Sequence, residues 1–311
     1  MRRREFLACG TGAALSLGVP AYPVRAERAL AVTRIADGVH GFAGTPALMT
    51  AANRGAICNL GFVVGRDAVA VIDSGGSVAE ARALIAAIEA VTERPIRYLI
   101  NTHMHPDHVF GNAAFADLGC EIIGHRNLPR ALASHGDFYL ANYRGAMGEL
   151  MADIRIVPPS RLIDGREELD LGDRKLVLAA WKPAHTDNDL TVLDVQTGTL
   201  FAGDLCFVDH LPTLDGSLLG WIGQLDALAS IGAISAIPGH GPVPSPWPEA
   251  LIAQRRYFDV LTRDLREAIA AGVPLGDAVL TAASGERSHW TLFDEYNTRN
   301  ATSAFAELEW E

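Results

Sequence analysis

A dense group of metal-ligating side chains follows an apolar segment a third of the way along the chain. Residues 96–100 predict a strand, and the next eight residues read NTHMHPDH. In a loop between a strand and a helix, His103 and His105 can face one ion, while Asp107 and His108 reach a second point nearby. A structural histidine would explain one such residue, but four buried polar groups without a metal would be costly. We therefore expect a metal site at the end of this strand.

Three further candidate ligands occur in the second half of the sequence. They are His185, Asp204 and His240, and each comes just after a short apolar run that predicts a strand. Functional groups collect on such loops because the strands support them rigidly. Taken singly, each residue fits a structural role equally well. Together with the first cluster they form a set of five histidines and two aspartates, which is sufficient for two closely spaced divalent ions.

Short strands and amphipathic helices recur in both halves of the sequence. Ser77 and Glu80 form a capping box that opens a helix over residues 77–92. Pro158-Pro159 marks a break near the middle, but no linker or low-complexity segment separates the halves. We expect strands at 59–64, 68–73, 96–100, 121–123, 176–180, 190–195 and 200–202, and further helices at 112–117, 127–153, 221–231, 248–271 and 275–283. This order favours one α/β domain of two similar halves, with helices outside a pair of sheets.

The order and spacing of the candidate ligands resemble those of a known family. The pattern His-x-His-x-Asp-His with later Gly-Asp and Gly-His loops is similar to that of the metallo-β-lactamase superfamily, over essentially all of residues 27–311. The resemblance implies an α/β fold, the αβ/βα four-layer sandwich, and two zinc ions per chain. It assigns His103, His105 and His185 to one zinc, Asp107, His108 and His240 to the other, and Asp204 to both. Asp73 matches a loop that supports the metal-binding turn in this fold.

The resemblance also implies a reaction. Two zinc ions lower the pKa of a shared water toward about 7, and the hydroxide attacks the carbonyl of a thioester, ester, lactone or amide in a small metabolite. Asp107 is the expected catalytic residue, because its carboxylate can also orient the nucleophile by accepting its hydrogen bond. Cys206 is an alternative zinc ligand, since thiolate binds zinc well. However, Gly203-Asp204 resembles the bridging-carboxylate pattern of glyoxalase-II-like hydrolases, so we expect Asp204 as the ligand and Cys206 as a strand residue.

Two groups of residues near these motifs have alternative interpretations. Tyr139, Asn142 and Tyr143 share one predicted helical stretch and either cover the substrate or pack as half-buried side chains. His210 either lines the cleft or lies on a surface loop, and the surface loop is our expectation.

A narrower resemblance links the chain to one group within the superfamily. The segments INTHMHPDHVFGNAAF, LPTLDGS and AELEW at residues 100–115, 211–217 and 306–310 resemble the SoxH-like "quinoprotein relay system zinc metallohydrolase" group. That group is associated with periplasmic PQQ-dependent dehydrogenases, so a quinoprotein dehydrogenase is an expected partner. Two other hypotheses are a non-catalytic, metal-bound accessory and a mononuclear-iron enzyme like the persulfide-oxidising relatives. His108 and His240 argue against the mononuclear-iron hypothesis, because they complete a second metal site.

The N-terminal residues predict export from the cytoplasm. Residues 2–7 read RRREFL, an uncharged stretch follows over 8–24, and small residues flank Arg25. This arrangement resembles a twin-arginine signal. We therefore expect a signal peptide over 1–26, a metallo-β-lactamase-like domain over 27–311, and a periplasmic location. The alternative is a basic amphipathic helix, which Gly10, Gly12, Gly18 and Pro20 disfavour.

Composition excludes two classes of partner. The net charge is −11, and Lys/Arg residues cluster only at the extreme N-terminus, so a nucleic-acid-binding surface is not expected. No apolar run reaches the roughly 18 residues that a membrane span needs. Beyond residue 26 the chain keeps Cys58, Cys120 and Cys206, too few for a disulfide scaffold, and we expect them reduced and buried. The partner that the family resemblance implies is a small-molecule substrate.

Overall fold

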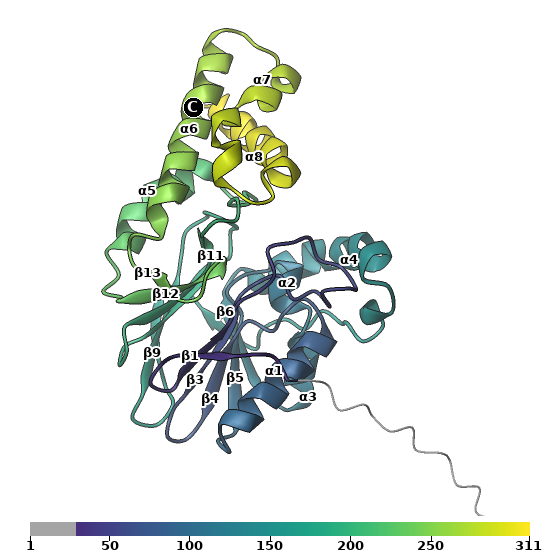
Figure 1. Ribbon diagram of the computed structural model, residues 1–311, viewed down its shortest axis with the longest axis vertical. Coiled ribbons are helices and arrows are strands. Elements are labelled where there is room, and N and C mark those ends of the chain that lie inside the picture. Colours follow the sequence, from purple (N-terminus) through teal and green to yellow (C-terminus); the bar gives the residue numbers. More distant parts are fainter. Residues whose placement is uncertain (1–28) are drawn as a thin grey trace, which may run out of the picture.

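Two mixed β-sheets form the centre of the computed structural model, which describes residues 29–311 (Figure 1). The seven strands of the first sheet lie in sequence order: β1 (Thr33–Ala36), β2 (Val39–Phe42), β3 (Leu60–Val64), β4 (Val69–Ile72), β5 (Ile96–Ile100), β6 (Glu121–His125) and β7 (Arg161–Ile163). Neighbours from β1 to β4 are antiparallel, and those from β4 to β7 are parallel. The predicted signal peptide, residues 1–26, lies outside the described residues.

The second sheet has six strands, which also lie in sequence order across the sheet, from β8 at one edge to β13 at the other. They are β13 (Ser245–Pro246), β12 (Ser235–His240), β11 (Thr199–Phe207), β10 (Leu190–Asp194), β9 (Lys175–Ala180) and β8 (Arg166–Asp170). Only β11 and β12 pair in parallel, and the other neighbours are antiparallel.

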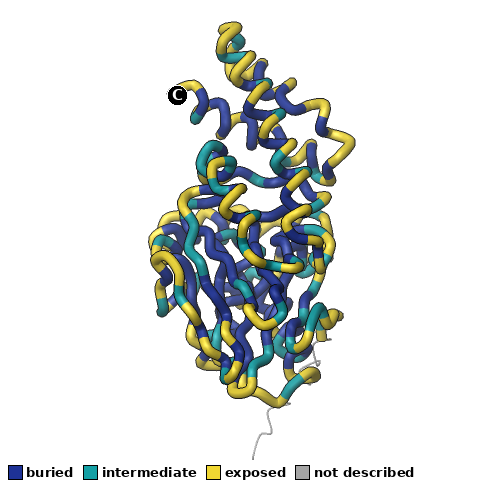
Figure 2. The backbone as a smooth tube through the Cα atoms, turned by 90° about the vertical axis from the view of Figure 1, so that its left-hand side faces the viewer, coloured by how far each residue is buried: buried dark blue, intermediate teal, exposed yellow. Residues whose placement is uncertain are grey.

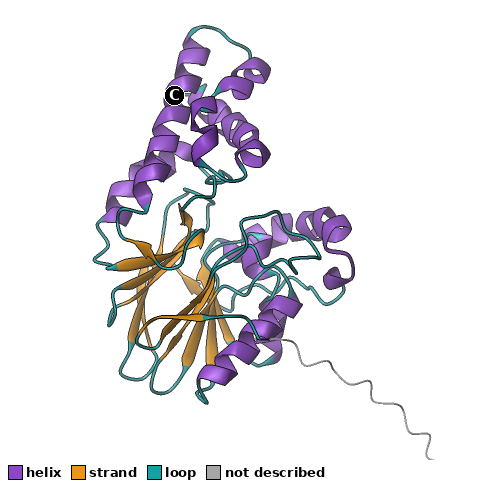
Figure 3. Ribbon diagram, viewed as in Figure 1, coloured by secondary structure: helices purple, strands orange, loops and turns teal. Residues whose placement is uncertain are grey.

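Helices cover the outer faces of both sheets (Figure 3). They are α1 (Val78–Val91), α2 (Pro106–Val109), α3 (Asn112–Asp117), α4 (Leu128–Met147), α5 (Leu218–Ala229), α6 (Leu251–Ala270), α7 (Leu275–Thr281) and α8 (Phe293–Leu308), with 3-10 turns at Gly148–Met151 and Ser284–His289. None of the helices in the described part of the chain combines the length and apolar character that crossing a membrane requires.

Three apolar cores lie between these layers. Successive residues of β4 alternate between two of them: Val69 and Val71 pack with the helices α1, α3 and α4, whereas Ala70 and Ile72 face the second sheet. The third core joins the outer face of the second sheet to helices α5 to α8, with Trp221 of α5 fully buried in it. The observed layers are therefore helix, sheet, sheet and helix, which confirms the predicted αβ/βα four-layer sandwich.

Helices α6, α7 and α8 extend beyond the sheets as a helical lobe, at the top of Figure 1. Buried residues continue from the sheets into this lobe (Figure 2). Leu261 and Leu265 of α6 and Phe305 of α8 belong to the same apolar core as the outer face of the second sheet. The lobe is thus packed continuously with the sandwich.

Local sequence signals located some elements better than others. Strand β5 and helix α3 have the predicted bounds, and Ser77 caps α1 by accepting a hydrogen bond from the Glu80 amide at 3.1 Å. The Glu80 carboxylate accepts from the amide of Gly76, at 2.7 Å, rather than from that of Ser77. Helices α2 and α8 and the strands β1, β2, β7, β8 and β13 are additional to the predicted elements.

Candidate metal centre

All seven predicted ligands meet at one end of the two sheets. Two come from the loop between β5 and α2, two from α2, one from the loop between β9 and β10, and two from β11 and β12: His103, His105, Asp107, His108, His185, Asp204 and His240. Each half of the fold therefore supplies part of the cluster.

The position of Asp204 differs from the prediction that it follows the end of a strand. Strand β11 continues through Asp204 to Phe207, and its pairing with β12 becomes irregular around Gly203. Gly203 has a φ of 52°, in the left-handed region that favours glycine. A Cβ there would also lie 2.7 Å from Cβ of Thr102, so a larger residue would displace the loop that carries the first histidines.

The first group of ligand atoms joins three histidines to Asp204, with all atoms within 4.8 Å of one another. His105 Nδ1 lies 3.1 Å from His103 Nε2 and 2.9 Å from His185 Nε2. Asp204 Oδ2 lies 3.7 Å and 3.3 Å from the same nitrogens of His103 and His185. The other ring nitrogen of each histidine contacts a protein group outside the cluster. For His103 it is Thr102 Oγ1 at 3.0 Å, and for His105 it is Asp215 Oδ2 at 3.0 Å. For His185 it is the Thr213 carbonyl at 2.7 Å.

The second group adjoins the first at Asp204. His108 Nε2 lies 3.2 Å from Asp204 Oδ1 and 3.6 Å from Asp107 Oδ2. His240 Nε2 lies 3.3 Å from Asp107 Oδ2 and 3.6 Å from Asp204 Oδ2. Asp204 therefore faces both groups, in the arrangement of a carboxylate shared by two metal ions.

Two buried atoms of the cluster, His108 Nε2 and Asp204 Oδ1, lie 3.2 Å apart but form no well-aligned hydrogen bond with each other or with any other group in residues 29–311. Leaving such atoms unpaired is costly, so native proteins rarely do it without a ligand. Imidazole nitrogen and carboxylate oxygen are donors that zinc and other divalent transition metals accept. The residues present thus fit a pair of metal ions.

Burial and charge give the two groups different protonation tendencies. Burial lowers the pKa of His103 well below its usual value and that of His185 to about 3, which favours the neutral imidazole that binds metal. Burial also acts to lower the pKa of His240, but the carboxylates of Asp204 and Asp107 outweigh it and raise that pKa to about 9. The two carboxylates therefore attract positive charge to this point, as a cation-binding site requires.

Asp73 supports the metal-binding turn, as the resemblance implied. It has a φ of 60° and is buried. Its carboxylate accepts hydrogen bonds from the amide of Thr102 at 2.7 Å and the hydroxyl of Thr102 at 2.8 Å, and it contacts His108 Nδ1 at 2.8 Å. One side chain thus fixes both the start of the loop and the orientation of His108, in the way outer carboxylates orient metal-ligating histidines.

The cysteines are not part of the predicted ligand set. All three cysteines of the described residues are free and buried. Cys206 packs in the core between the second sheet and its helices, as expected for a strand residue. Cys58 is the one beside the centre, where its thiol donates to the Asp107 carbonyl at 2.9 Å. Burial raises the pKa of this thiol well above its usual value, so it stays protonated.

A cavity of about 90 Å³ opens onto the cluster. Besides ligand residues, its wall includes Tyr139 and Tyr143 of α4, His210, and Tyr296 and Arg299 of α8. The two tyrosines of α4 therefore line the site, whereas Asn142 is exposed and does not. The expectation of a surface loop for His210 is wrong, because its side chain is buried and its ring lies 4.7 Å from that of His240.

Tyr296 and Arg299 had no sequence signal, because α8 itself was not predicted. Asp215, which contacts both His105 and Arg299, appeared only within the segment 211–217 of the narrower resemblance.

A second, mainly apolar cavity of about 370 Å³ shares Ile57, His210 and His240 with the first. The site is thus polar over the metal cluster and apolar beside it.

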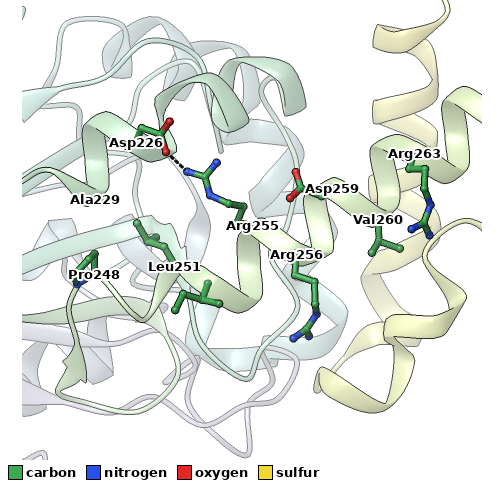
Figure 4. Close-up of a pocket in the computed structure, with 10 residues that line it drawn as sticks. Asp226, Ala229, Pro248, Leu251, Arg255, Arg256, Asp259, Val260 and Arg263 are labelled. Carbon is green, nitrogen blue, oxygen red and sulfur yellow. Dashed lines mark hydrogen bonds and ion pairs between the residues drawn. The ribbon is translucent and has the colours of Figure 1, made fainter.

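A larger groove lies elsewhere, between α5 and α6 (Figure 4). It has a volume of about 660 Å³ and none of the seven candidate ligands lines it. Its cations are paired, Arg255 with Asp226 at 2.5 Å and Arg256 with Glu286 at 2.8 Å. The chemistry therefore belongs to the smaller cavity.

Comparison with known proteins identifies the family. The model of the metallo-beta-lactamase superfamily matches residues 53–271, a range that contains every candidate ligand. The chain belongs to the metallo-β-lactamase superfamily. Family, fold and the His/Asp cluster together make it a metallohydrolase of that superfamily.

Solved structures share this fold at low sequence identity. A metallo-beta-lactamase from Pontibacter korlensis has a TM-score of 0.61 and 18% identity, covering 74% of this chain and 99% of its own. The stereoselective inverting sec-alkylsulfatase Pisa1 from Pseudomonas sp. has a TM-score of 0.67 and 15% identity, covering 88% of this chain and 49% of its own. Among curated proteins, the linear primary-alkylsulfatase of Pseudomonas sp. (strain ATCC 19151) is 38% identical over 45 residues. That match spans 14% of this chain and only 8% of the alkylsulfatase.

Proposed function

We propose that the protein is a periplasmic dizinc hydrolase that cleaves a thioester, ester or lactone of a small metabolite. The observation that carries this proposal is the shared carboxylate of Asp204, which faces two groups of ligand atoms and leaves Oδ1 buried without a hydrogen-bond partner in the described chain. A single-metal site would need neither the second group nor a bridging carboxylate. The mononuclear-iron alternative is therefore the weaker one.

The ligand roles follow from the two groups. One zinc would be held by His103, His105 and His185, the other by Asp107, His108 and His240, and both by Asp204. Zinc ions in such a site supply Lewis acidity and lower the pKa of water, so that a nucleophile is available at neutral pH.

Asp107 is the residue we assign to orientation of the nucleophile. It lines the cavity as well as the cluster. Burial acts to raise its pKa, but His108 and His240 outweigh burial and lower it to about 2. Its carboxylate is thus ionised at neutral pH and can accept a hydrogen bond from the attacking water.

An Asp107→Ala variant tests this role. We expect turnover to fall by at least about 100-fold, because general-base and orienting groups contribute that much, with the fold retained by circular dichroism. Asp137→Ala is the matched control, since Asp137 lies exposed on α4 and does not line the cavity. Full activity in Asp107→Ala would refute the assigned role.

Sulfate-ester hydrolysis is a second candidate. The curated relative and one of the similar structures are both alkylsulfatases, and the structure covers 88% of this chain against 74% for the metallo-beta-lactamase. A panel of 4-nitrophenyl acetate, an acyl thioester, a lactone, nitrocefin and 4-nitrophenyl sulfate separates the classes. Turnover of the carbonyl compounds supports our proposal, and turnover of the sulfate alone replaces it.

The periplasmic location and a quinoprotein dehydrogenase partner are further parts of the proposal. They are supported by the twin-arginine-like residues 2–7 and by the resemblance of segments 100–115 and 211–217 to the SoxH-like group. Replacing Arg3 and Arg4 by lysine should retain the protein in the cytoplasm. Capture of a quinoprotein from a periplasmic extract, with no turnover of any panel compound, would instead favour the non-catalytic accessory.

A further inference from the structure

One wall of the cavity over the metal cluster is built from side chains that no predicted role uses. Tyr139 and Tyr143 are four residues apart on α4, and Tyr296 and Arg299 are three residues apart on α8. Residues at these spacings share one face of a helix. Two helices far apart in the sequence therefore each present a pair of polar groups to the same cavity.

The three tyrosine hydroxyls of this wall are free to bind a ligand. None of them has a hydrogen-bond partner among residues 29–311. Tyr257, by contrast, is buried within the helical lobe and its hydroxyl contacts the amides of Asn297 and Asn300, each at 3.0 Å. The hydroxyl of Tyr257 is thus fully paired within the protein, whereas the tyrosines of the cavity wall keep their hydroxyls available for a ligand.

Arg299 adds a positive charge at the same place. Its guanidinium donates to Asp215 Oδ1 at 2.9 Å, and the other oxygen of Asp215 lies 3.0 Å from His105 Nε2. Asp215 therefore anchors Arg299 beside the metal cluster. A guanidinium has five N–H donors, so this contact leaves others for a ligand. The side chain is 51% exposed, which keeps it accessible from the cavity mouth.

We propose that Arg299 and the hydroxyls of Tyr139, Tyr143 and Tyr296 bind a carboxylate of the substrate at a distance from the bond that is cleaved. A guanidinium matches a carboxylate through two parallel hydrogen bonds, and neutral hydroxyls add hydrogen-bond donors without adding negative charge that would repel it. The neighbouring apolar cavity, which shares His210 and His240, accommodates an uncharged part of the same molecule. This inference rests on the proposed hydrolase function and narrows its substrate class to anionic acyl compounds.

A matched pair of esters tests the inference on the zinc-loaded protein. Mono(4-nitrophenyl) adipate carries a free carboxylate, and its methyl ester is neutral. We expect kcat/KM to favour the acid by about tenfold or more, the range of a charge-assisted hydrogen-bonded pair. Arg299→Met should abolish this preference, mainly by raising KM for the acid. Arg266→Met is the control, because Arg266 is equally exposed at 51% but pairs with Glu311.

Substitutions of the tyrosines provide a second test, in which each variant loses only one hydroxyl group. Tyr143→Phe and Tyr296→Phe each remove one hydroxyl and should lower the preference for the acid by about three- to tenfold, as loss of one hydrogen bond does. Equal kcat/KM values for acid and methyl ester in the unaltered protein would overturn the inference while the hydrolase function stands.

A binding measurement covers the case in which neither ester is cleaved. The monoanilide of adipic acid has the same carboxylate but no labile ester, and its affinity is measured by calorimetry. Binding that Arg299→Met weakens about tenfold or more, with Arg266→Met unchanged, supports the carboxylate site even if the hydrolase proposal has failed. Absence of binding, or equal binding by Arg299→Met, overturns the inference.

Discussion

Each histidine of the metal cluster uses one ring nitrogen for the protein and presents the other to the cluster. The protein groups that contact the first of these nitrogens are the hydroxyl of Thr102, the carboxylates of Asp73 and Asp215, and the carbonyls of Ile57 and Thr213. Such contacts fix the ring orientation before any ion binds. The cluster is therefore preorganised by residues that no ligand motif contains.

Asp73 is the most testable of these partners. Asp73→Asn preserves the shape of the side chain, and asparagine tolerates the φ of 60°. The substitution replaces one carboxylate oxygen by an amide that cannot accept hydrogen bonds from both Thr102 and His108. We expect zinc affinity to fall by about 10- to 100-fold, measured by competition with a chromogenic chelator.

A matched variant controls for backbone effects at that position. Asp173 has a φ of 54° but pairs with Arg66 on the surface. Asp173→Asn should leave zinc affinity unchanged. The same loss of affinity in both variants would mean that Asp73 does not act through His108.

Gly239 allows the close approach of β12 to the shared carboxylate. A Cβ at this position would overlap Oδ1 of Asp204. Gly239→Ala should therefore displace Asp204 and lower the metal content below two ions per chain, as measured by elemental analysis. Gly145 on α4 has open space around it. Gly145→Ala should keep both ions and stabilise the fold by about 0.5–1 kcal/mol; an unchanged metal content in Gly239→Ala would contradict the packing argument.

At the scale of elements, the buried side chain of Arg174 links the two sheets. Arg174, just before β9, pairs with Asp194 at the end of β10, at 2.8 Å and with both side chains buried. Its guanidinium also donates to the carbonyl of Asp37 at 2.7 Å and that of Val64 at 3.3 Å, both in the first sheet's hairpins. The side chain of Arg174 therefore holds the two sheets together at the end of the sandwich where these hairpin turns lie.

Arg174→Met tests that closure. It would leave Asp194 buried without its charge partner, so we expect the free energy of unfolding to fall by about 3–5 kcal/mol in chemical denaturation. Lys175→Met is the comparison, since Lys175 and Glu168 form an exposed pair, and its cost should be about 0–1 kcal/mol. Similar losses for both variants would show that the Arg174 pair has no special role.

The sequence predicted elements well where a local signal marked their ends. Helix α1 begins at the predicted cap, because the Ser77 side chain forms the expected hydrogen bond. Helix α8 follows Leu292, whose φ is 57°, and has no capping side chain. Asp294 and Glu295 in its first turn are the local start signal, but without a capping residue before them they did not mark the helix. Strand β11 was predicted too short because the chain irregularity at Gly203 is a property of its pairing with β12.

At the scale of the molecule, the sandwich brings the ligand-bearing ends of both sheets together. Four candidate ligands belong to the first half of the fold and three to the second. This convergence was predictable, because the ligand motifs follow strands and the resemblance assigned each position. The substrate wall was not, because Tyr296 and Arg299 come from a helix that the sequence did not reveal, and cavity shape depends on packing.

Metal binding should also stabilise the whole fold, because the ligands come from both halves. Ions that bind only the folded state add about 4 kcal/mol when free metal exceeds the dissociation constant 1,000-fold. We expect a chelator to lower the melting temperature and added zinc to restore it, as followed by scanning calorimetry. A melting temperature that is insensitive to both would show that the cluster does not hold metal tightly.

The metal content of the purified protein, measured by inductively coupled plasma mass spectrometry, tests the central claim most directly. The two ligand groups that share Asp204 predict two zinc ions per chain. One iron per chain, or less than one metal ion of any kind after incubation with zinc, would contradict the dinuclear hydrolase.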